Sequence, residues 1–282
     1  MAMDTKKVER EFRKLRRSMI KLRKRCSPSE VHKLRTRSRR VETILQTLSL
    51  DQNGSGQRII EAIIPVRKRA GKVRDMDVLI ELAASLDIAS EAECKVQLLE
   101  YLGHKRFAKA RKLHKSARKY RSSVTPELKG LASSVERTLD RHNDPSDWPA
   151  YAAATALRLG GEIRKWPKLT ARNLHSFRLK VKELRDVLGL STASIAQAKA
   201  LQEVTDAIGA WHDWSELAAL ANEVLQHAGR CEVRAKVRAR VEEQLRHAVS
   251  LSNQVRRRYF GDARRMSSPG QSAMEAAAKL AA

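Results

Sequence analysis

Two short segments of this sequence carry histidine, arginine and lysine at the same spacing. Residues 32–39 read HKLRTRSR and residues 175–182 read HSFRLKVK, so both follow the pattern H-x-[LF]-R-x-[RK]-x-[RK]. Arginine can hold a phosphate group through two parallel N–H donors, and histidine near neutral pH can donate a further hydrogen bond. These residue types at this spacing predict the binding of a phosphate-bearing anion.

A second pair of segments recurs in the same order. Residues 71–76 read GKVRDM and residues 209–214 read GAWHDW, which aligns Arg74 with His212. The distance from the histidine to this position is 42 residues in the first copy and 37 in the second. One loop of different length accounts for that offset. Two elements that match in order predict a duplicated helical unit with pseudo-twofold symmetry.

Both histidine segments must lie on helices if their cations are to line up. At about 100° per residue, positions i, i+3 and i+7 share one face of a helix. Apolar residues such as Leu34 and Phe177 fall on the opposite side, where each helix would pack. A helix that packs on one side and presents ordered cations on the other suits a repeating anion. We call these faces the first cationic row, which comprises His32, Arg35 and Arg39, and the second cationic row, which comprises His175, Arg178, Lys182 and Arg185.

Each assignment has a structural alternative. A basic helix face is usually only solvated, and a histidine near a helix start more often supports the fold than a ligand. The duplication favours ligand binding for the two rows and for Arg74 and His212. Asp75 and Asp213 follow these two residues, and we interpret both as helix caps or as partners of a base.

A long basic segment, residues 91–121, offers further candidates. Most of its lysines and arginines must face water. Arg106 falls on the same side as Ala110 and Leu113, so it is expected to point toward the rest of the fold, and Lys109 lies at the border of that side. Contact with the ligand and absence of such contact are equal alternatives for Arg106 and Lys109.

The charge of the chain indicates an anionic partner. Its 282 residues include 57 lysines and arginines against 32 aspartates and glutamates, a formal net charge of +25. Self-repulsion on that scale opposes compaction, so we expect the charge to serve a partner of opposite sign. Some of the basic residues are expected only to face solvent, and we interpret Arg37 and Arg40 as solvent-exposed.

The sequence predicts an all-α fold, because lysine, arginine, glutamate and alanine dominate while glycine and proline are few. We expect two helical bundles, residues 1–141 and 142–260, with a linker at 142–145 and a mobile tail at 261–282. Breaks are expected at Gly71 and before Trp211. The expected helices cover residues 6–25, 30–49, 57–70, 72–86, 91–121, 125–140, 151–166, 171–188, 191–208, 211–226 and 231–260.

The cysteines and the apolar segments bear on the location of the protein. Cys26, Cys94 and Cys231 lie far apart and are odd in number, which favours reduced thiols in a cytosol. No run approaches the ~20 apolar residues that a membrane helix needs, and the N-terminus lacks the apolar region of a secretory signal. We therefore expect a cytoplasmic protein with no membrane partner.

These motifs resemble the CHAD family, the conserved histidine α-helical domain. The resemblance rests on the two cationic rows and on the segment GKVRDMD at 71–77, and it extends from about Lys6 to Phe260. It implies two helical bundles around a basic central channel that holds inorganic polyphosphate, often on polyphosphate granules.

The sequence departs from the family's pattern in two places. The usual Leu-Arg-Tyr after the second row reads LRD at 184–186, and this acidic residue is expected to weaken anion contacts locally. The second Arg-Asp position reads HD at 212–213.

Such domains often accompany a triphosphate tunnel enzyme, whose signature is ExExK on a β-strand. Residues 91–95 read EAECK, but they begin a predicted helix, where alternate positions do not share a face. We therefore do not interpret this segment as a tunnel-enzyme motif.

We expect the protein to bind inorganic polyphosphate without acting as an enzyme, and to associate with polyphosphate granules in the cytoplasm. No cofactor or metal is expected, and no oligomeric state is predicted. The first alternative is a nucleic-acid-binding protein, although 4% aromatic residues is poor for base stacking, so nucleic acid should bind more weakly. The second is a phosphohydrolase or phosphotransferase that uses histidine, although no carboxylate cluster or P-loop accompanies the histidines.

Overall fold

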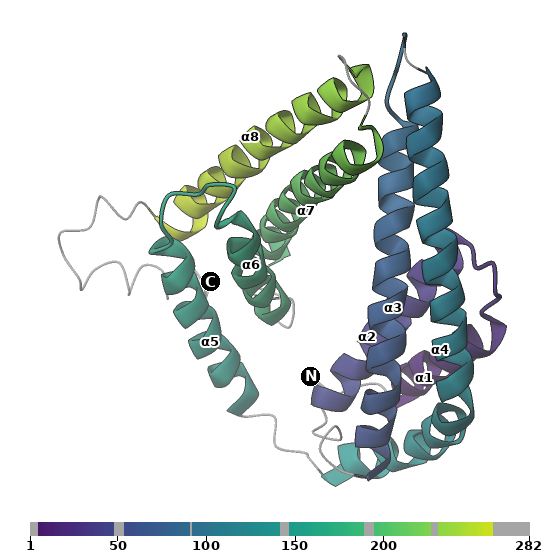
Figure 1. The fold of residues 1–282 in the computed structure, drawn as a ribbon. Helices are drawn as coiled ribbons and strands as arrows, with labels where there is room; N and C mark the ends of the chain where they lie inside the picture. The colour runs from purple at the N-terminus through teal and green to yellow at the C-terminus, as the bar shows by residue number, and fades with distance from the viewer. Residues whose placement is uncertain are drawn as a thin grey trace. The chain divides into compact units, whose positions relative to one another are not determined.

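The computed structural model describes residues 5–47, 54–90, 92–141, 147–188, 195–226 and 231–261. All regular structure in these ranges is helical, so the all-α prediction is confirmed there. Figure 1 shows the helices, which are α1 (Thr5–Lys21), α2 (Pro28–Thr47), α3 (Gly54–Ala84), α4 (Ala92–Arg141), α5 (Asp147–Arg164), α6 (Leu174–Leu188), α7 (Ile195–Val224) and α8 (Glu232–Phe260).

The chain divides into two compact units, Met1–Asp144 and Pro145–Ala282, which we call unit 1 and unit 2. The linker predicted at 142–145 lies outside the described residues, and so does the predicted tail apart from Gly261. That glycine has a φ of 75° directly after α8. Glycine adopts a positive φ without a Cβ penalty, which suits this position at the end of the helix.

Unit 1 is a ring of four helices in which α1 packs on α2, α2 on α3, α3 on α4 and α4 on α1. Figure 1 shows α3 and α4 as a long pair lying side by side. The apolar residues of α1 follow helical spacing, so Phe12, Leu15 and Met19 are all buried on one face. They join a core formed by residues 59–73 of α3 and 110–128 of α4. Further buried residues, Leu79, Ala83, Leu98 and Leu102, line the parts of α3 and α4 next to their connection.

Unit 2 repeats this order of packing. Helix α5 packs on α6, α6 on α7, α7 on α8 and α8 on α5. Its core includes Leu159 of α5, Phe177 of α6, Ile208 of α7 and Ala248 of α8. In each unit the second helix, which carries the cationic row, is therefore held between the first and the third.

The predicted breaks at Gly71 and before Trp211 are wrong, because α3 and α7 run straight through both positions. Helix propensity disfavours glycine by only about 1 kcal/mol, and burial of its neighbours outweighs that cost. Ala70 and Val73 are fully buried beside the first glycine. Ile208 is fully buried beside Gly209.

The predicted break between residues 121 and 125 is also wrong, because α4 continues past Pro126. Proline lacks the N–H that would bond four residues back, so a helix usually stops there. Val124 and Leu128 lie on either side of this proline and are buried in the core of unit 1. Their packing extends the apolar face of α4 across the proline and keeps the helix continuous.

A short connector precedes each histidine helix. The first connector, residues 22–27, ends in a capping box. The Ser27 N–H donates to Glu30 Oε2 over 2.7 Å, and the Glu30 N–H donates to Ser27 Oγ over 3.2 Å. The second connector is residues 165–173. There the Thr170 N–H donates to Asn173 Oδ1 over 2.9 Å, and the Asn173 amide donates to the Lys168 carbonyl over 2.9 Å.

Candidate anion-binding site

The first cationic row lies on the side of α2 that faces away from the core. Leu34 and Val41 are fully buried on the opposite side of the helix. His32 and Arg39 are exposed, and Arg35 is half-buried. The predicted separation of an apolar face and a cationic face on this helix is therefore confirmed.

Arg35 lies over a glycine of the neighbouring helix. A Cβ atom placed on Gly71 of α3 would stand 3.7 Å from Arg35 Nε. Arg74 follows Gly71 by three residues and so shares its face of α3. The packing of α2 on α3 thus brings Arg35 and Arg74 to the same part of unit 1.

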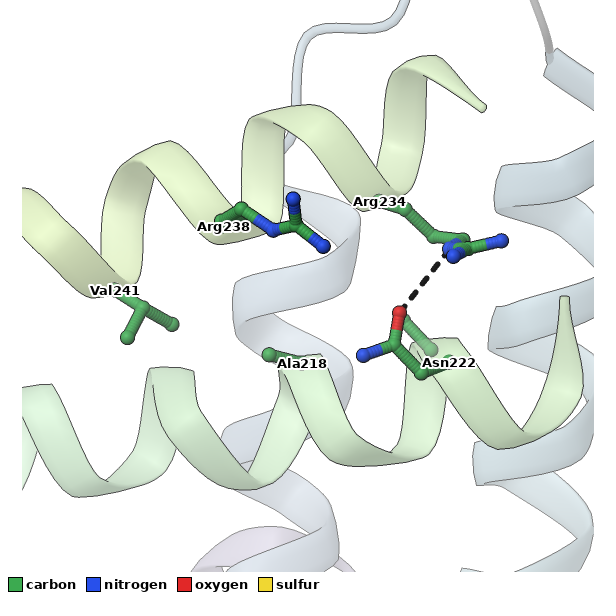
Figure 2. A pocket seen from close by; sticks show the side chains of 6 residues that line it. Ala218, Asn222, Arg234, Arg238 and Val241 are labelled. Carbon is green, nitrogen blue, oxygen red and sulfur yellow. Dashed lines mark hydrogen bonds between the residues drawn. The ribbon is translucent and has the colours of Figure 1, made fainter. Parts of the chain in front are cut away.

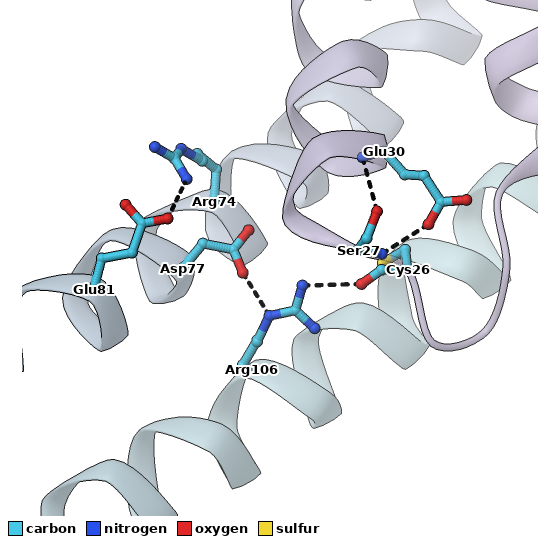
Figure 3. A network of polar contacts seen from close by, with 7 residues as sticks. All are labelled: Cys26, Ser27, Glu30, Arg74, Asp77, Glu81 and Arg106. Atoms are coloured by element: carbon cyan, nitrogen blue, oxygen red, sulfur yellow. Dashed lines mark hydrogen bonds and ion pairs between the residues drawn. The ribbon is translucent and has the colours of Figure 1, made fainter. Parts of the chain in front are cut away.

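Among the described residues, the partner of Arg74 is an exposed carboxylate. Its Nη1 atom lies 3.3 Å from Glu81 Oε1, and the Glu81 side chain is 62% exposed. An ion pair with so exposed a carboxylate is weak, because water and salt screen it. Figure 3 shows Arg74 and Glu81 pairing along one side of α3.

The second cationic row is built in the same way, with Arg178 of α6 over Gly209 of α7. A Cβ atom on Gly209 would stand 2.9 Å from Arg178 Nη2, closer than real Cβ contacts allow. Arg178 Nε donates a hydrogen bond to the carbonyl of Thr205 over 3.0 Å. Any larger residue here would force the end of the Arg178 side chain to shift, so the recurrence of glycine in both segments has a steric reason in unit 2.

His175 and His212 meet beside this arginine. Their ring centroids are 5.6 Å apart, with a tilt of 38° between the planes. His212 Nδ1 lies 3.7 Å from Asp213 Oδ1. The structure therefore gathers His175, Arg178 and His212, which the sequence placed on separate segments.

Asp213 is the acidic member of this group. Burial raises the pKa of its carboxyl group, because desolvation disfavours the charged form, while the positive charges of His212 and Arg178 oppose that rise. The interpretation of Asp213 as a partner of a base agrees with its distance to His212. The equivalent Asp75 is exposed on α3.

The far end of the second row is partly neutralised. Arg185 donates to the Asp186 carboxylate and, over 2.5 Å, to Gln202 Oε1 of α7. Gln202 in turn donates to Asp206 Oδ1 over 2.7 Å. This pairing is consistent with the expectation that Asp186 weakens anion contacts locally. Lys182, one turn earlier on α6, is half-buried.

Arg106 points into unit 1, as its position among apolar residues predicts. Its Nε atom donates to Asp77 Oδ1 over 2.5 Å, and its Nη2 atom donates to the Cys26 carbonyl over 2.9 Å. Figure 3 shows Arg106 between α3 and the end of the first connector. The Asp77 side chain is only 1% exposed, so this ion pair is largely buried. Lys109, three residues farther along α4, is half-buried.

The interpretation of Arg37 as solvent-exposed is wrong. Arg37 is half-buried and donates to Ser18 Oγ and, over 3.2 Å, to the Lys14 carbonyl. The packing of α1 on α2 brings these groups together, which spacing within one helix cannot predict. Arg40 is exposed, as expected, although it also lies 3.5 Å from Glu11 Oε2.

Sequence reasoning missed Asn173 and Arg256 as residues that support the site, and it gave no role to Asp77, which closes the motif at 71–77. A weak signal was present for Asn173. Ser27 and Thr170 each stand five residues before a row histidine, and each exchanges a hydrogen bond with the residue three positions later. No comparable pattern marks Arg256, and the partner of Asp77 cannot be read from its motif, because Arg106 lies 29 residues away in the sequence.

A small cavity lies between α7 and α8, apart from the predicted site residues. It has a volume of about 80 Å³ and is lined by Ala218, Ala221, Asn222, Arg234, Arg238 and Val241. Figure 2 shows Arg234 donating to Asn222 Oδ1, a bond of 3.1 Å. Because Arg234 is held by this bond and the other lining groups are mostly apolar, we assign no ligand to the cavity.

The described residues also bear on metals and membranes. Among them, no three histidine, cysteine, aspartate or glutamate side chains gather in a way that would hold a metal ion. No helix in the same ranges is both long enough and apolar enough to cross a membrane. Glu93 and Lys95 of the EAECK segment lie in the first turn of α4, so this part of the segment is helical, as predicted, and not a strand.

Comparison with known proteins gives one match. A family model for the CHAD domain matches residues 7–222 of the chain. The match ends within α7, so α8 lies beyond it, although the resemblance was expected to reach the end of that helix. No curated protein and no solved structure matches the chain. Because the matched region covers most of the 282 residues and contains both cationic rows, the chain belongs to the CHAD domain family.

Proposed function

We propose that this protein binds inorganic polyphosphate through its two cationic rows and does not act on it chemically. The observation that carries the proposal is the construction found in both units. In each, an arginine three residues after a histidine lies over a glycine of the neighbouring helix. A basic face that served only solubility would not need the same contact between an arginine and a glycine in both units.

The arrangement of the cations favours a chain of phosphates over a single one. Residues three and four apart on a helix lie about 5–6 Å from one another, so each row offers donors in series along its helix. Arginine can hold each phosphate through two N–H groups, and histidine adds one donor. A repeating anion engages several of these at once, which a lone phosphate cannot do. The ligand contacts that we propose are His32, Arg35, Arg39, Arg74, Lys109, His175, Arg178, Lys182, Arg185 and His212. Arg106, the remaining candidate from the sequence, is left out of this set because its guanidinium group is bonded to Asp77 and to the Cys26 carbonyl.

Three features support the proposal that the two units arose by duplication. Both are rings of four helices in the same order. Both place an arginine of the second helix over a glycine of the third. Both begin the histidine helix with a side-chain cap at the same distance before the histidine. The pseudo-twofold symmetry and the central channel implied by the family resemblance stay predictions, as does association with polyphosphate granules.

Competition binding tests the proposed function. The protein is loaded with labelled long-chain polyphosphate and challenged with pyrophosphate, nucleoside triphosphate, RNA and duplex DNA at physiological salt. We expect only unlabelled long polyphosphate to compete efficiently. The affinity should also fall steeply as salt rises, because each neutralised phosphate releases counterions and contributes a slope of about 0.9 in duplex DNA. Equal competition by duplex DNA would instead support the nucleic-acid alternative.

A further inference from the structure

Both histidine helices are preceded by a connector, and the last helix of each unit reaches that connector with an arginine. In unit 1, Arg106 of α4 donates to the carbonyl of Cys26 over 2.9 Å. In unit 2, Arg256 of α8 donates to the carbonyl of Trp166 over 2.5 Å and to that of Arg164 over 3.2 Å. We propose that Arg106 and Arg256 are positioning residues, which fix the connectors and thereby set how the two cationic rows are presented.

The contacts in unit 1 explain how Arg106 would act. Cys26 immediately precedes the capping box that starts α2, so its carbonyl lies where the direction of that helix is decided (Figure 3). The Asp77 carboxylate of α3 holds the other side of the same guanidinium. Arg106 therefore links α4, α3 and the start of α2 through one rigid planar group.

A second side chain of α4 reinforces the first connector. His114 Nδ1 lies 3.1 Å from the carbonyl of Leu22, at the start of the connector. The first connector is thus held at both ends by α4, at Leu22 by His114 and at Cys26 by Arg106. His32 follows only six residues after Cys26, so a shift of the connector would be passed directly to the first row.

The contacts in unit 2 follow the same logic with different partners. The carbonyls of Arg164 and Trp166 lie at the C-terminal end of α5, where helix carbonyls lack intrahelical donors and the helix dipole favours a cation. The Arg256 guanidinium also lies 5.9 Å from the ring of Phe177, which lies between His175 and Arg178 in the sequence and on the buried side of α6. Arg256 thus contacts both the second connector and the helix that it precedes.

Aromatic packing joins these two contacts. The ring of Trp166 meets the ring of Phe177 edge to face, with centroids 5.6 Å apart. Arg256 therefore fixes Trp166 through its carbonyl and Phe177 through its ring. Helix α8 lies beyond the residues that the CHAD model matches. Its Arg256 nevertheless contacts α6, the helix that carries the second cationic row.

The inference separates two kinds of arginine. Arg35 and Arg178 are proposed to touch the ligand, whereas Arg106 and Arg256 would act through the backbone that carries them. The effect on binding rests on the function proposed above. The effect on the connectors does not, and it can be measured without any ligand.

Hydrogen exchange of the full-length protein without ligand tests the positioning role in unit 2. Arg256→Met removes the donors and keeps an apolar stem near Phe177. Arg257→Met removes the same charge from an exposed neighbour on α8 and serves as the control. We expect Arg256→Met to speed amide exchange in residues 165–177 by roughly tenfold and to leave unit 1 unchanged. Arg257→Met should have no such effect.

Three further variants keep this test decisive. Arg256→Lys retains a charged donor, so it should restore much of the protection and also provides a folded variant if Arg256→Met fails to fold. In unit 1, Asp77→Asn alone should leave the Arg106 bond to Cys26 in place and keep residues 22–31 protected. The double variant Asp77→Asn with Arg106→Met removes the cation without leaving a buried carboxylate unpaired. It should speed amide exchange selectively in residues 22–31.

Binding provides a second readout. Arg256→Met should shift the ring resonances of His175 in NMR spectra and lower the affinity for long-chain polyphosphate by roughly tenfold, whereas Arg257→Met should do neither. Unchanged exchange in the connectors, or exchange that rises equally in both units, overturns the positioning role. If the wild-type protein does not bind polyphosphate, the proposed function fails while the exchange result still decides the role of the two arginines.

Discussion

The guanidinium group of Arg178 occupies the space that a side chain on Gly209 would need. A Cβ atom there would stand 2.9 Å from Arg178 Nη2, whereas a Cβ atom on Gly71 would stand 3.7 Å from Arg35 Nε. The two units thus share the same contact between an arginine and a glycine. A Cβ atom fits beside the arginine in unit 1, whereas in unit 2 it would force the arginine to move. That difference allows the contact to be tested within a single chain.

We expect Gly71→Ala and Gly209→Ala to change stability in opposite directions. Alanine favours a helix over glycine by about 1 kcal/mol, and Gly71→Ala should gain that amount because its new methyl group makes an ordinary contact. Gly209→Ala should displace Arg178 and lose its bond to the Thr205 carbonyl, which costs on the order of 1.5–3 kcal/mol. Urea unfolding of both variants measures this. Equal stabilisation of both variants would show that Arg178 can move away from residue 209 without loss of stability.

Position should matter more than total charge for binding. Changing Arg35 and Arg178 together to alanine should weaken polyphosphate binding by roughly 100-fold or more, because each charge-assisted hydrogen bond contributes about 1.5–3 kcal/mol. The control changes Arg17 and Lys112, which are exposed, and removes the same formal charge. Its affinity should fall only slightly.

Two points make that comparison clean. Lys14 is unsuited as a control, because it lies 2.8 Å from Glu11 Oε1 and the Glu11 side chain is largely buried. Thermal melting without ligand must come first, since Arg178 also bonds the Thr205 carbonyl. If both double variants bind equally well at physiological salt, the ordered rows have no special role and the surface is only generally basic.

Asp213→Asn should stabilise the protein at neutral pH. Burial raises the pKa of this carboxyl group above its ordinary value of 3.8, so the folded state is less easily ionised than the unfolded state. The wild-type protein therefore loses stability as pH rises from about 3.8 through the raised pKa, and the loss is complete above it. An asparagine does not ionise and avoids that loss.

Melting temperatures between pH 3.5 and neutral check this expectation. The advantage of Asp213→Asn over the wild type should grow with pH and then level off. Glu242→Gln removes an exposed carboxylate from α8 of the same unit and controls for the change in net charge. The affinity for polyphosphate should also rise in Asp213→Asn, because a negative charge beside Arg178 and His212 is lost. A constant advantage at every pH would contradict the role assigned to burial.

Incubation with polyphosphate and Mg²⁺ or Mn²⁺ separates binding from chemistry. We expect the chain length to stay unchanged and no phosphate to be released, because the proposed contacts are hydrogen-bond donors and cations. Gel analysis of chain length and a phosphate assay provide the measurements. Phosphate release that disappears in His32→Gln or His175→Gln, with a contaminating phosphatase excluded, would show that the protein is an enzyme.

The sequence by itself determined the helical class, the faces of the histidine helices and the CHAD family. These follow from local periodicity, because the 3.6-residue repeat of a helix places His32 and Arg35 on one side and Leu34 on the other. The spacing also identified Gly71 and Gly209 as matching positions. It assigned them the wrong local role, since a glycine in a basic segment indicates a break unless packing across the helix is known.

Only the tertiary structure decided what lies against each of these residues. The continuity of α3 through Gly71 depends on burial of Ala70 and Val73. The partners of Arg106, Asp77 at 29 residues and Cys26 at 80 residues along the chain, are brought close by the ring of helices. Contacts over such separations leave no periodic signal, because their energy depends on packing between helices and not on the conformation of one segment.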